Sequence, residues 1–389
     1  MRILVTDGST RTALAVVRSL GARGHEVIVG ERQAPALAHR SRYCSQAIVY
    51  PDPETAEAAF VDRLVAEVDR LGVEVLVPIA DVAVAATVAA RDRFSRRCRI
   101  GAPSAVAIEA AANKAETIRL AEQLGVPVPR TWILAAPGDP LPADLSYPTI
   151  VKPHRSRVRT DKGWRACIVG RASTPAALRD ELQARHPAEF PMLLQEMIPG
   201  VGIGVFAACH DGRPVAAFAH RRLREKPPWG GVSVLSESVT PDPRAWEWAT
   251  RLLGALEWNG VAMVEYKLDA EGVPRFMEIN GRFWGSLQLA VDAGVDFPAI
   301  LLDILDGHPP ATPPAYRVGV KNRWLWGDVD SLISAMRGRA SEQATVATRA
   351  RALGAFLKFW EPGLRYESPR LSDLRPFVLE TRRWFGGTA

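Results

Sequence analysis

Cysteine is scarce in this chain, and the few cysteines are scattered. The 389 residues include Cys44, Cys98, Cys167 and Cys209, with no CxxC pair and no Cys/His spacing typical of a metal site. This pattern favours reduced, mostly buried thiols in a cytoplasm over a disulfide framework.

Long apolar runs are also missing. No segment approaches the length of a membrane-spanning helix. The opening residues MRILVTDGS begin as an apolar strand, but Asp7 and Gly8 interrupt it too early for the apolar core of a signal peptide. Hydrophobic residues make up 47% and charged residues 24% of the chain, which is typical of globular proteins that fold in water. We therefore expect a cytoplasmic protein of two or three domains with no membrane span.

The fingerprint of a dinucleotide site is absent from the first predicted domain, residues 1–104. Short apolar strands alternate there with amphipathic helices, which indicates a doubly wound parallel sheet. Such sheets bind ligands beyond the carboxyl ends of their strands, so residues 7–11 and 79–81 form a predicted substrate-facing rim. The first turn reads DGSTRTA and lacks GxGxxG, so NAD or FAD is not expected.

Acidic residues are paired on a predicted β-hairpin at residues 261–282, VAMVEYKLDAEGVPRFMEINGR. Apolar and polar residues alternate on both arms. Glu278 and Asn280 are two residues apart and project to one face, which Glu265 on the opposing arm can share. Two carboxylates and an amide oxygen suit Mg²⁺ held against phosphates. A surface hairpin with solvated acids is the alternative.

Two basic segments accompany the hairpin. A helix is predicted over residues 105–124, with Asn113 and Lys114 in its middle, and the apolar strand YPTIVKP carries Lys152 near its end. A lysine late on a buried strand is costly unless it meets an anion, although it could instead extend to the solvent from a sheet edge. The following segment, HRSRVRTDKGW, is predicted to be a flexible loop that closes over phosphates, despite its low glycine content.

A second basic loop is predicted to follow strands at residues 204–210 and 214–220. It begins RRLREKPPWGG, and its arginines could clamp a phosphate or a carboxylate through paired hydrogen bonds. A solvated basic loop is the alternative.

The C-terminal segment from residue 311 to residue 389 holds 13 Lys/Arg and 7 Asp/Glu, and therefore the whole formal excess of +6. It also contains Trp324, Trp326, Trp360 and Trp384. Such a segment could bind nucleic acid, an anionic membrane surface or an acidic substrate. Because no nucleic-acid motif accompanies the charge, we favour a helical appendage whose aromatic residues pack on the body, and no nucleic-acid partner.

The order of motifs NK…VKP…QEMIPG…VEYK…MEINGR resembles the ATP-grasp superfamily, which includes biotin carboxylase, carbamoyl phosphate synthetase and D-alanine–D-alanine ligase. The resemblance covers about residues 1–307. It implies a pre-ATP-grasp domain at 1–104 and an ATP-grasp fold of two α+β subdomains, at 105–193 and 194–307, around the nucleotide. The overall class is thus α/β and α+β, with a small, mostly helical C-terminal extension at 308–389.

The resemblance also implies ATP as cosubstrate and Mg²⁺ as cofactor, with Mn²⁺ as an alternative ion. The matching nucleotide-binding residues are Lys114, Lys152, Gln195, Glu196, Met197 and Ile198. The matching metal ligands are Glu265, Glu278 and Asn280. Catalytic roles fall to Arg282, which matches an arginine that stabilises the transferring phosphoryl group, and to Arg222 or Arg224 from the second basic loop. His220 could deprotonate an amine, although a histidine at a strand end is commonly structural.

The implied reaction is activation of a substrate carboxylate as an acyl phosphate, followed by amide formation with an amine (or attack by a thiol). This chain departs from the family pattern at two places. No acidic residue that could hold the ribose follows residues 195–198, which match the family's adenine-binding hinge strand. The loop after Lys152 is also poor in glycine. A bicarbonate-dependent carboxylase is disfavoured because no carrier domain or MKM-like site is present. A non-catalytic nucleotide-binding regulator would be expected to lack phosphate or metal ligands. Dimers are common in the family, so a homodimer is also expected.

Overall fold

The computed structural model describes residues 1–226, 231–337 and 346–387. The N-terminal unit is a parallel five-stranded sheet in the order β3-β2-β1-β4-β5, which confirms the predicted doubly wound sheet. Its strands are β1 (Arg2–Val5), β2 (Glu26–Glu31), β3 (Gln46–Val49), β4 (Val75–Val77) and β5 (Arg99–Ile100), and its helices are α1 (Arg11–Ala22), α2 (Glu57–Leu71) and α3 (Asp81–Ala89). Thr10 caps α1 by accepting a hydrogen bond from the Ala13 amide.

The sequence predicted one continuous helix over residues 105–124, and this is wrong because the structure has two helices there. They are α4 (Ala105–Ala112) and α5 (Lys114–Gln123). Asn113 between them has an extended backbone, and its side chain accepts hydrogen bonds from the amides of Ala115 and Glu116. Asparagine is a strong N-cap, so it starts a new helix where an apolar pattern alone suggests continuity. The break places Lys114 at the first turn of α5.

An antiparallel sheet in the order β10-β7-β11-β6 forms the next unit. Its elements are β6 (Thr131–Leu134), β7 (Thr149–Pro153), β10 (Gly170–Ala172), β11 (Met192–Glu196) and α6 (Pro175–Gln183). The segment predicted as a flexible loop after Lys152 is instead a hairpin, β8 (Arg157–Thr160) and β9 (Gly163–Ala166). Alternating exposed arginines hid its strand character.

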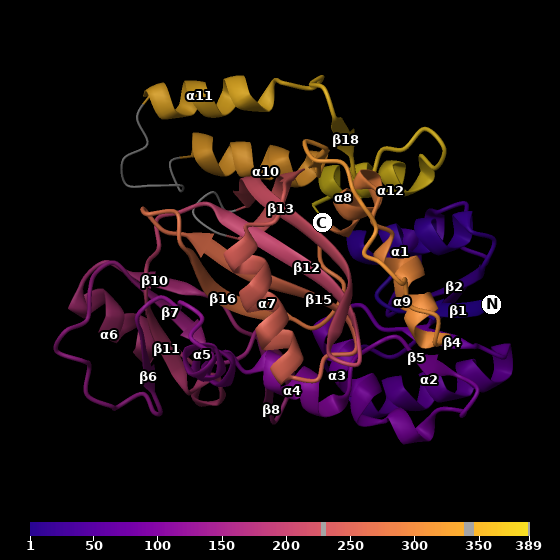
Figure 1. Cartoon of the computed structure of the whole chain (residues 1–389), viewed down its shortest axis with the longest axis horizontal. Helices are drawn as coiled ribbons and strands as arrows, with labels where there is room; N and C mark the ends of the chain where they lie inside the picture. The colour runs from indigo at the N-terminus through magenta and orange to yellow at the C-terminus, as the bar shows by residue number, and fades with distance from the viewer. Residues whose placement is uncertain (227–230, 338–345, 388–389) are drawn as a thin grey trace.

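The centre of the molecule is a seven-stranded sheet in the order β16-β15-β12-β13-β14-β17-β18 (Figure 1). Its strands are β12 (Gly202–His210), β13 (Arg213–Lys226), β14 (Val232–Ser238), β15 (Gly260–Leu268), β16 (Pro274–Asn280), β17 (Lys321–Arg323) and β18 (Leu364–Tyr366). The associated helices are α7 (Pro243–Ala255), α8 (Leu287–Ala293) and α9 (Phe297–Leu305). The predicted hairpin at 261–282 is present as β15 and β16. The predicted loop from residue 221 is wrong as far as residue 226, since β13 continues through it, and residues 227–230 lie outside the described residues.

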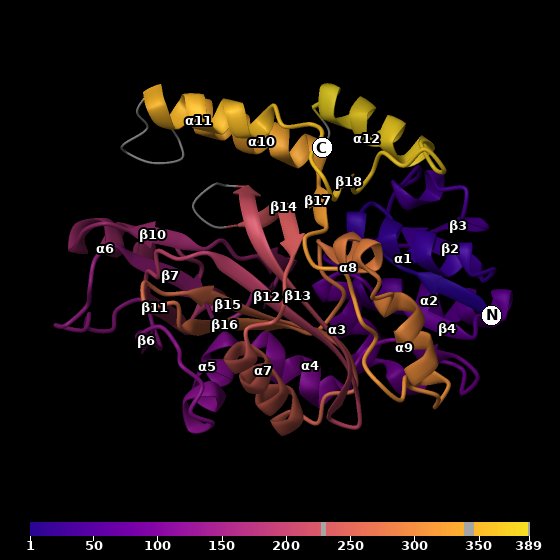
Figure 2. The same ribbon diagram turned by 45° about the horizontal axis from the view of Figure 1, so that its top comes forward.

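The C-terminal extension is mostly helical but is not a separate appendage. Its helices are α10 (Leu325–Met336), α11 (Val346–Phe356) and α12 (Arg375–Phe385), which line one edge of the molecule in both views (Figures 1 and 2). Its strands β17 and β18 continue the central sheet beyond β14. The division proposed at residue 308 therefore separates segments that share one sheet.

Two buried contacts hold the extension and the N-terminal unit together. Arg18 on α1 donates to Asp373 at 2.9 Å and to the carbonyl oxygens of Glu367 and Ser368. The Arg11 guanidinium lies 3.9 Å from the Trp324 ring centroid. A hydrophobic cluster from α1, α8, α9 and β12, including Phe206, Trp284 and Phe297, joins the parallel sheet to the central one. These contacts fix the positions of the two sheets relative to each other.

No helix in the described ranges is long and apolar enough to cross a bilayer.

Candidate active site

The two acids that are predicted to bind a metal lie opposite each other on neighbouring strands of the central sheet. Glu265 on β15 and Glu278 on β16 are direct cross-strand partners. The same row continues through Gly204 on β12 to His220 on β13. Because opposed residues of adjacent strands share a face, the carboxylates lie side by side, as the alternation in the sequence predicts.

Cations surround the two carboxylates. Arg222 Nη2 lies 2.6 Å from Glu265 Oε2, and Lys114 Nζ lies 3.5 Å from Glu278 Oε2. Burial and the Glu278 charge raise the pKa of Glu265 despite the Arg222 guanidinium. Burial also opposes the charge of Glu278, but Lys114 and Lys152 outweigh it and lower the Glu278 pKa. Both acids therefore depend on positive charge from their surroundings.

The donor set fits a divalent cation. Asn280 Nδ2 donates to Glu278 Oε1 at 3.1 Å, so the amide oxygen of Asn280 is left as an acceptor beside the two carboxylates. Three hard oxygen donors on one face match the preference of Mg²⁺, which keeps other positions for water and phosphate oxygens. No group of three or more His, Cys, Asp or Glu side chains suited to a metal occurs in the part of the chain that is described. An ion here would therefore rely on Glu265, Glu278, Asn280 and ligands from its substrate.

Lys152 lies at the end of β7, held by Gln195. Its Nζ donates to Gln195 Oε1 at 2.8 Å, and Gln195 Nε2 donates to Thr131 Oγ1 at 3.0 Å. Burial lowers the pKa of Lys152 to about 8. The Gln195 side chain thus connects Lys152 to Thr131 on the neighbouring strand β6.

The predicted adenine hinge is partly used within the fold. The Glu196 amide donates to the Arg130 carbonyl at 2.9 Å, and the Glu196 carboxylate accepts from the Arg130 amide at 3.3 Å. Met197 and Ile198 follow directly after β11, and Lys267 Nζ lies 3.4 Å from the Ile198 carbonyl oxygen. The amide and the carboxylate of Glu196 are thus both paired with Arg130, and the adenine-binding role of residues 195–198 stays a prediction.

Arg282 joins the end of β16, which carries two of the predicted metal ligands, to the predicted rim. Its Nε and its Nη2 both donate to the Asp81 carboxylate, and the distance from Nη2 to the carboxylate oxygen is 3.4 Å. Burial opposes ionisation of Asp81, but Arg282 and Lys114 lower its pKa overall. Both residues line a cavity of about 100 Å³, whose other walls include Val84, Ile108, Ala111, Lys114, Trp164, Glu278 and Asn280. The structure therefore brings Asp81, Lys114, Glu278, Asn280 and Arg282 together.

Asp7 links the strand ends of the rim. It lies just after β1 with φ 57°, and its carboxylate accepts hydrogen bonds from the Ala80 amide at 2.8 Å and the Ile79 amide at 3.3 Å. A left-handed backbone is uncommon for aspartate and is often found at functional sites. Asp7 thereby holds the carboxyl ends of β1 and β4 in place beside Arg282.

Three of the four predicted catalytic residues do not line this cavity, namely Arg222, which contacts Glu265, and Arg224 and His220. A β-bulge after Arg222 turns Arg224 to the opposite face, where it donates to Asp328 on α10 at 2.7 and 2.6 Å. His220 shares the row of Glu265 but is buried against Phe206 and Ser286. Burial and the Arg222 charge hold the His220 pKa well below its usual value. The sequence of β13 alone does not indicate the bulge after Arg222 or the burial of His220.

The sequence predicted that the segment after Lys152, which forms the β8–β9 hairpin, closes over phosphates, but it did not single out Arg155, Ser156 or Trp164. Ser156 Oγ accepts a hydrogen bond from Lys114 Nζ at 2.9 Å, and Arg155 and Trp164 line the cavity. The hairpin is fixed to the N-terminal unit, because the Trp164 amide donates to the Glu54 carbonyl at 2.7 Å and the Trp164 indole donates to Glu57 at 2.6 Å. The tryptophan in an otherwise polar segment was the available signal.

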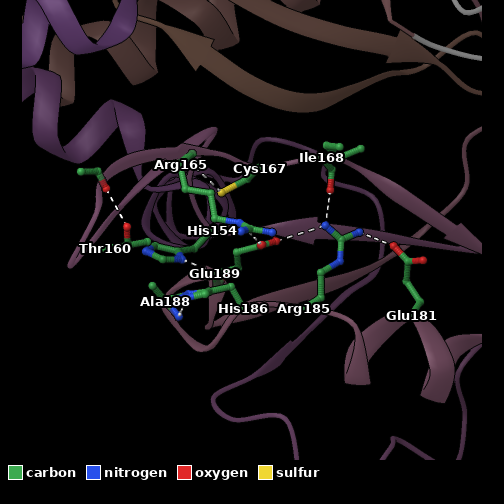
Figure 3. A network of polar contacts seen from close by, with 11 residues as sticks. His154, Thr160, Arg165, Cys167, Ile168, Glu181, Arg185, His186, Ala188 and Glu189 are labelled. Atoms are coloured by element: carbon green, nitrogen blue, oxygen red, sulfur yellow. Dashed lines mark hydrogen bonds and ion pairs between the residues drawn. The ribbon is translucent and has the colours of Figure 1, made fainter. Parts of the chain in front are cut away.

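A buried glutamate holds the hairpin from its other side (Figure 3). Glu189 accepts from Arg165 of β9 at 3.3 Å and from Arg185 at 3.1 Å. Its backbone carbonyl contacts His154 Nδ1 at 3.2 Å, and the His154 carbonyl accepts from the Lys114 amide at 2.8 Å. This network connects the hairpin to the start of α5 and so to the lysine beside Glu278.

Comparisons with known proteins agree with this architecture. Residues 188–327 match a family model described as ATP-grasp in the biosynthetic pathway with Ter operon. A search of curated protein sequences finds no match. Among solved structures, an L-amino acid ligase from Bacillus licheniformis is similar with a TM-score of 0.62 and 16% identity, covering 78% of this chain and 74% of the ligase.

Two further structures extend the comparison. A biotin carboxylase from Campylobacter jejuni has a TM-score of 0.64 and 15% identity, over 82% of this chain and 74% of the carboxylase. An N5-carboxyaminoimidazole ribonucleotide synthetase has a TM-score of 0.65 and 12% identity, over 91% of this chain and 96% of the synthetase. The resemblance inferred from the motifs is therefore confirmed: the chain has the ATP-grasp fold, and its residues 188–327 match an ATP-grasp family.

Proposed function

We propose that this chain is an ADP-forming, ATP-dependent ligase that joins a carboxylic acid to an amine. The observation that carries the proposal is the row of Glu265 and Glu278, opposed on one face of the sheet and surrounded by Lys114, Lys152, Arg222 and Arg282. Two half-buried acids side by side are unfavourable unless cations compensate them. A magnesium–nucleotide complex supplies such a cation and also uses the lysines.

In this proposal each residue has a part. Glu265, Glu278 and Asn280 hold Mg²⁺ (or Mn²⁺), whose charge would draw electrons from the terminal phosphates of ATP. Lys114 and Lys152 contact the phosphates, and Glu196, Met197 and Ile198 lie along the adenine side after a local rearrangement. Two neighbours carry nucleotides, since the Campylobacter biotin carboxylase is a β,γ-ATP complex and the synthetase is an ADP complex. A third, from Hydrogenobacter thermophilus, contains MgADP and bicarbonate.

The chemistry proceeds in two balanced steps. A carboxylate oxygen of the acid attacks the γ-phosphorus, the bond to the β-phosphate oxygen breaks, and ADP leaves with that electron pair. The amine nitrogen then attacks the acyl carbon, phosphate leaves, and the nitrogen loses a proton. Arg282 and Arg222 would stabilise the charge on the transferring group. The hairpin above the cavity excludes water, which would otherwise hydrolyse the acyl phosphate.

The test is release of ADP and phosphate from the purified protein with Mg-ATP, against pooled carboxylic acids with and without amines. Formation of ADP that requires both an acid and an amine, with an amide detected by mass spectrometry, supports the proposal. Nucleotide binding without turnover in any pool would contradict it and favour a nucleotide-binding regulator.

A second candidate is a carboxylase that uses bicarbonate as its acid. It is favoured by the coverage of 91% of this chain and 96% of the N5-carboxyaminoimidazole ribonucleotide synthetase, which extends into the C-terminal extension. Bicarbonate therefore forms its own arm of the assay. Turnover that needs bicarbonate, and no other acid, would select this reaction over amide ligation.

A further inference from the structure

The cavity beside Glu278 has two unlike ends. At one end lie the charged and amide side chains of the proposed reaction, which come from α5 and from the end of β16. The other end is a wall built by helices α3 and α4, which contact each other. The residues with which these two helices line the cavity are apolar, apart from Asp81 and Glu109. We call the apolar ones the apolar wall: Val82, Val84, Ala85, Ile108, Ala111 and Ala112.

The sequences of the two helices explain this wall. Helix α3 reads DVAVAATVA and α4 reads AVAIEAAA, so valine, isoleucine and alanine occupy nearly every position. A helix of this composition is apolar on almost every side, including the side that faces the cavity. Three members of the wall are alanines, whose side chains end at Cβ, so the wall leaves room for a ligand there. Ala85 is half-buried and Ala112 is exposed, which makes both accessible from the cavity.

Trp164 adds an aromatic side to the cavity from the β8–β9 hairpin. The indole N–H is the only polar group of a tryptophan side chain. In Trp164 it donates to Glu57 of the N-terminal unit at 2.6 Å. Because this hydrogen bond satisfies the indole, Trp164 offers aromatic carbon to a ligand in the cavity.

The charged side chains beside the apolar wall are engaged with one another. Arg155 donates to Glu109 through both Nη atoms, from Nη1 at 3.0 Å. Arg282 is paired with Asp81. A hydroxyl, an amide or a second carboxylate on a ligand side chain would have to break one of these ion pairs to gain a partner. Since burial of a polar group without a hydrogen bond is unfavourable, this end of the cavity selects against polar side chains.

We propose that the acid activated by this protein carries an apolar side chain, which lies against the apolar wall while its carboxylate meets Lys114 and Arg282. The carboxylate end of this inference rests on the proposed ligase function, whereas the apolar preference concerns the cavity itself. Each methylene group that the wall removes from water favours binding. Bicarbonate has no side chain and would leave the wall uncovered.

Acids of the same shape but different polarity test the inference: valine with threonine, leucine with asparagine, and 4-methylpentanoate with succinamate. Each is supplied to the full-length protein with Mg-ATP and hydroxylamine, whose nitrogen attacks an acyl phosphate to give a hydroxamate and free phosphate. We expect at least about tenfold higher kcat/KM for the apolar member of each pair. Saturation-transfer NMR with Mg-ADP measures binding of the same acids without turnover, and it should rank them alike.

Ala112→Leu extends the apolar wall into the cavity. It should lower kcat/KM for free leucine about tenfold and have little effect on the smaller acid alanine, because it fills the space that the longer side chain needs. Ala105→Leu is the matched control, since Ala105 is an exposed residue of α4 that does not line the cavity. Unchanged unfolding midpoints establish that both variants fold.

Equal reaction and binding of the apolar and polar acids would overturn this inference and leave the ligase proposal standing. Turnover with bicarbonate alone, or an unchanged preference for leucine over alanine in Ala112→Leu, would also overturn it. Stronger binding of the apolar acids without hydroxamate from any of them would support the role of the wall and contradict the ligase proposal. Absence of binding by every acid would contradict both.

Discussion

At the scale of single residues, the opposed carboxylates dominate the site. Glu265 and Glu278 are half-buried as direct cross-strand partners, and the positive charges around them compensate that arrangement. Two carboxylates held this close together favour the binding of a cation that carries more charge than one lysine.

Removing one acid should abolish turnover. Glu278→Gln keeps the shape of the side chain but removes a charge, and we expect acid-dependent ADP release to fall about a hundredfold. Glu271→Gln is the matched control, because Glu271 is exposed in the turn of the same hairpin. Unchanged ADP release in Glu278→Gln would contradict the assigned metal site.

Lys152 should make nucleotide affinity depend on pH. Burial lowers its pKa to about 8, so the free protein loses this ammonium charge as the pH rises through that value. Because phosphate prefers the protonated form, affinity for ATP should fall above about pH 8, and binding there should take up a proton. Calorimetry in two buffers of different ionisation enthalpy measures that uptake.

Lys152→Arg provides the control for this titration. Arginine stays protonated throughout the range, so the variant should bind nucleotide with an affinity that does not change between about pH 7 and pH 9. A pH dependence that persists in Lys152→Arg would assign the titration to another group.

At the scale of elements, the bulge in β13 divides two arginines between two tasks. Arg222 contacts Glu265, whereas Arg224 contacts Asp328 in the C-terminal extension. Arg224→Ala should lower the free energy of unfolding by about 2 kcal/mol and leave turnover unchanged, because a buried charge-assisted contact is lost far from the cavity. Arg222→Ala should cause a large loss of turnover, and it should also lower the free energy of unfolding because Glu265 loses its guanidinium partner. Thermal melts and ADP release, measured on both variants, decide the assignment.

The β8–β9 hairpin should be sensitive at one glycine. Gly163 has φ 102°, and a Cβ atom there would lie 2.3 Å from the Glu54 carbonyl oxygen. Gly163→Ala should therefore displace the hairpin from the N-terminal unit, and more ADP should form per product as water reaches the acyl phosphate. Faster tryptic cleavage near Lys162 would report the displacement.

Gly138→Ala is the control for this substitution, because nothing lies within 4 Å of a Cβ at Gly138. If Gly163→Ala keeps the wild-type ratio of ADP to product, the hairpin does not protect the intermediate.

Local patterns predicted the elements of the site better than their connections. Alternation over 261–282 predicted both the hairpin and the shared face of Glu265 and Glu278, since strand geometry fixes them within one segment. The N-cap at Asn113 was visible in the sequence but was outweighed by the apolar run around it. The bulge at Arg222, the burial of His220 and the pairing of β14 with β17 all depend on distant partners, which spacing within one segment does not encode.

At the scale of the whole molecule, a buried contact joins the two ends of the chain. Asp373 accepts from Arg18 at 2.9 Å, from Ser41 at 2.7 Å and from the Arg42 amide at 2.9 Å. Asp373→Asn should lower the free energy of unfolding by about 3 kcal/mol, because Arg18 would remain buried without its counter-charge. Denaturant unfolding measures the loss, and Asp303→Asn, an exposed site, serves as control.

Hydrogen exchange can show whether this coupling reaches across the molecule. In Asp373→Asn, amides of α1 and of α12 should lose protection together, since both elements depend on the same contact. Loss confined to α12 would indicate that the C-terminal extension unfolds on its own.

The Arg18–Asp373 contact also has a consequence for synthesis. Arg18 emerges early from the ribosome, and its partner follows 355 residues later. Until then the N-terminal sheet must either keep this guanidinium in water or hold it buried and unpaired. Growing chains therefore form this contact only when nearly the whole sequence has been translated, so chains that terminate prematurely should be less stable and more readily degraded.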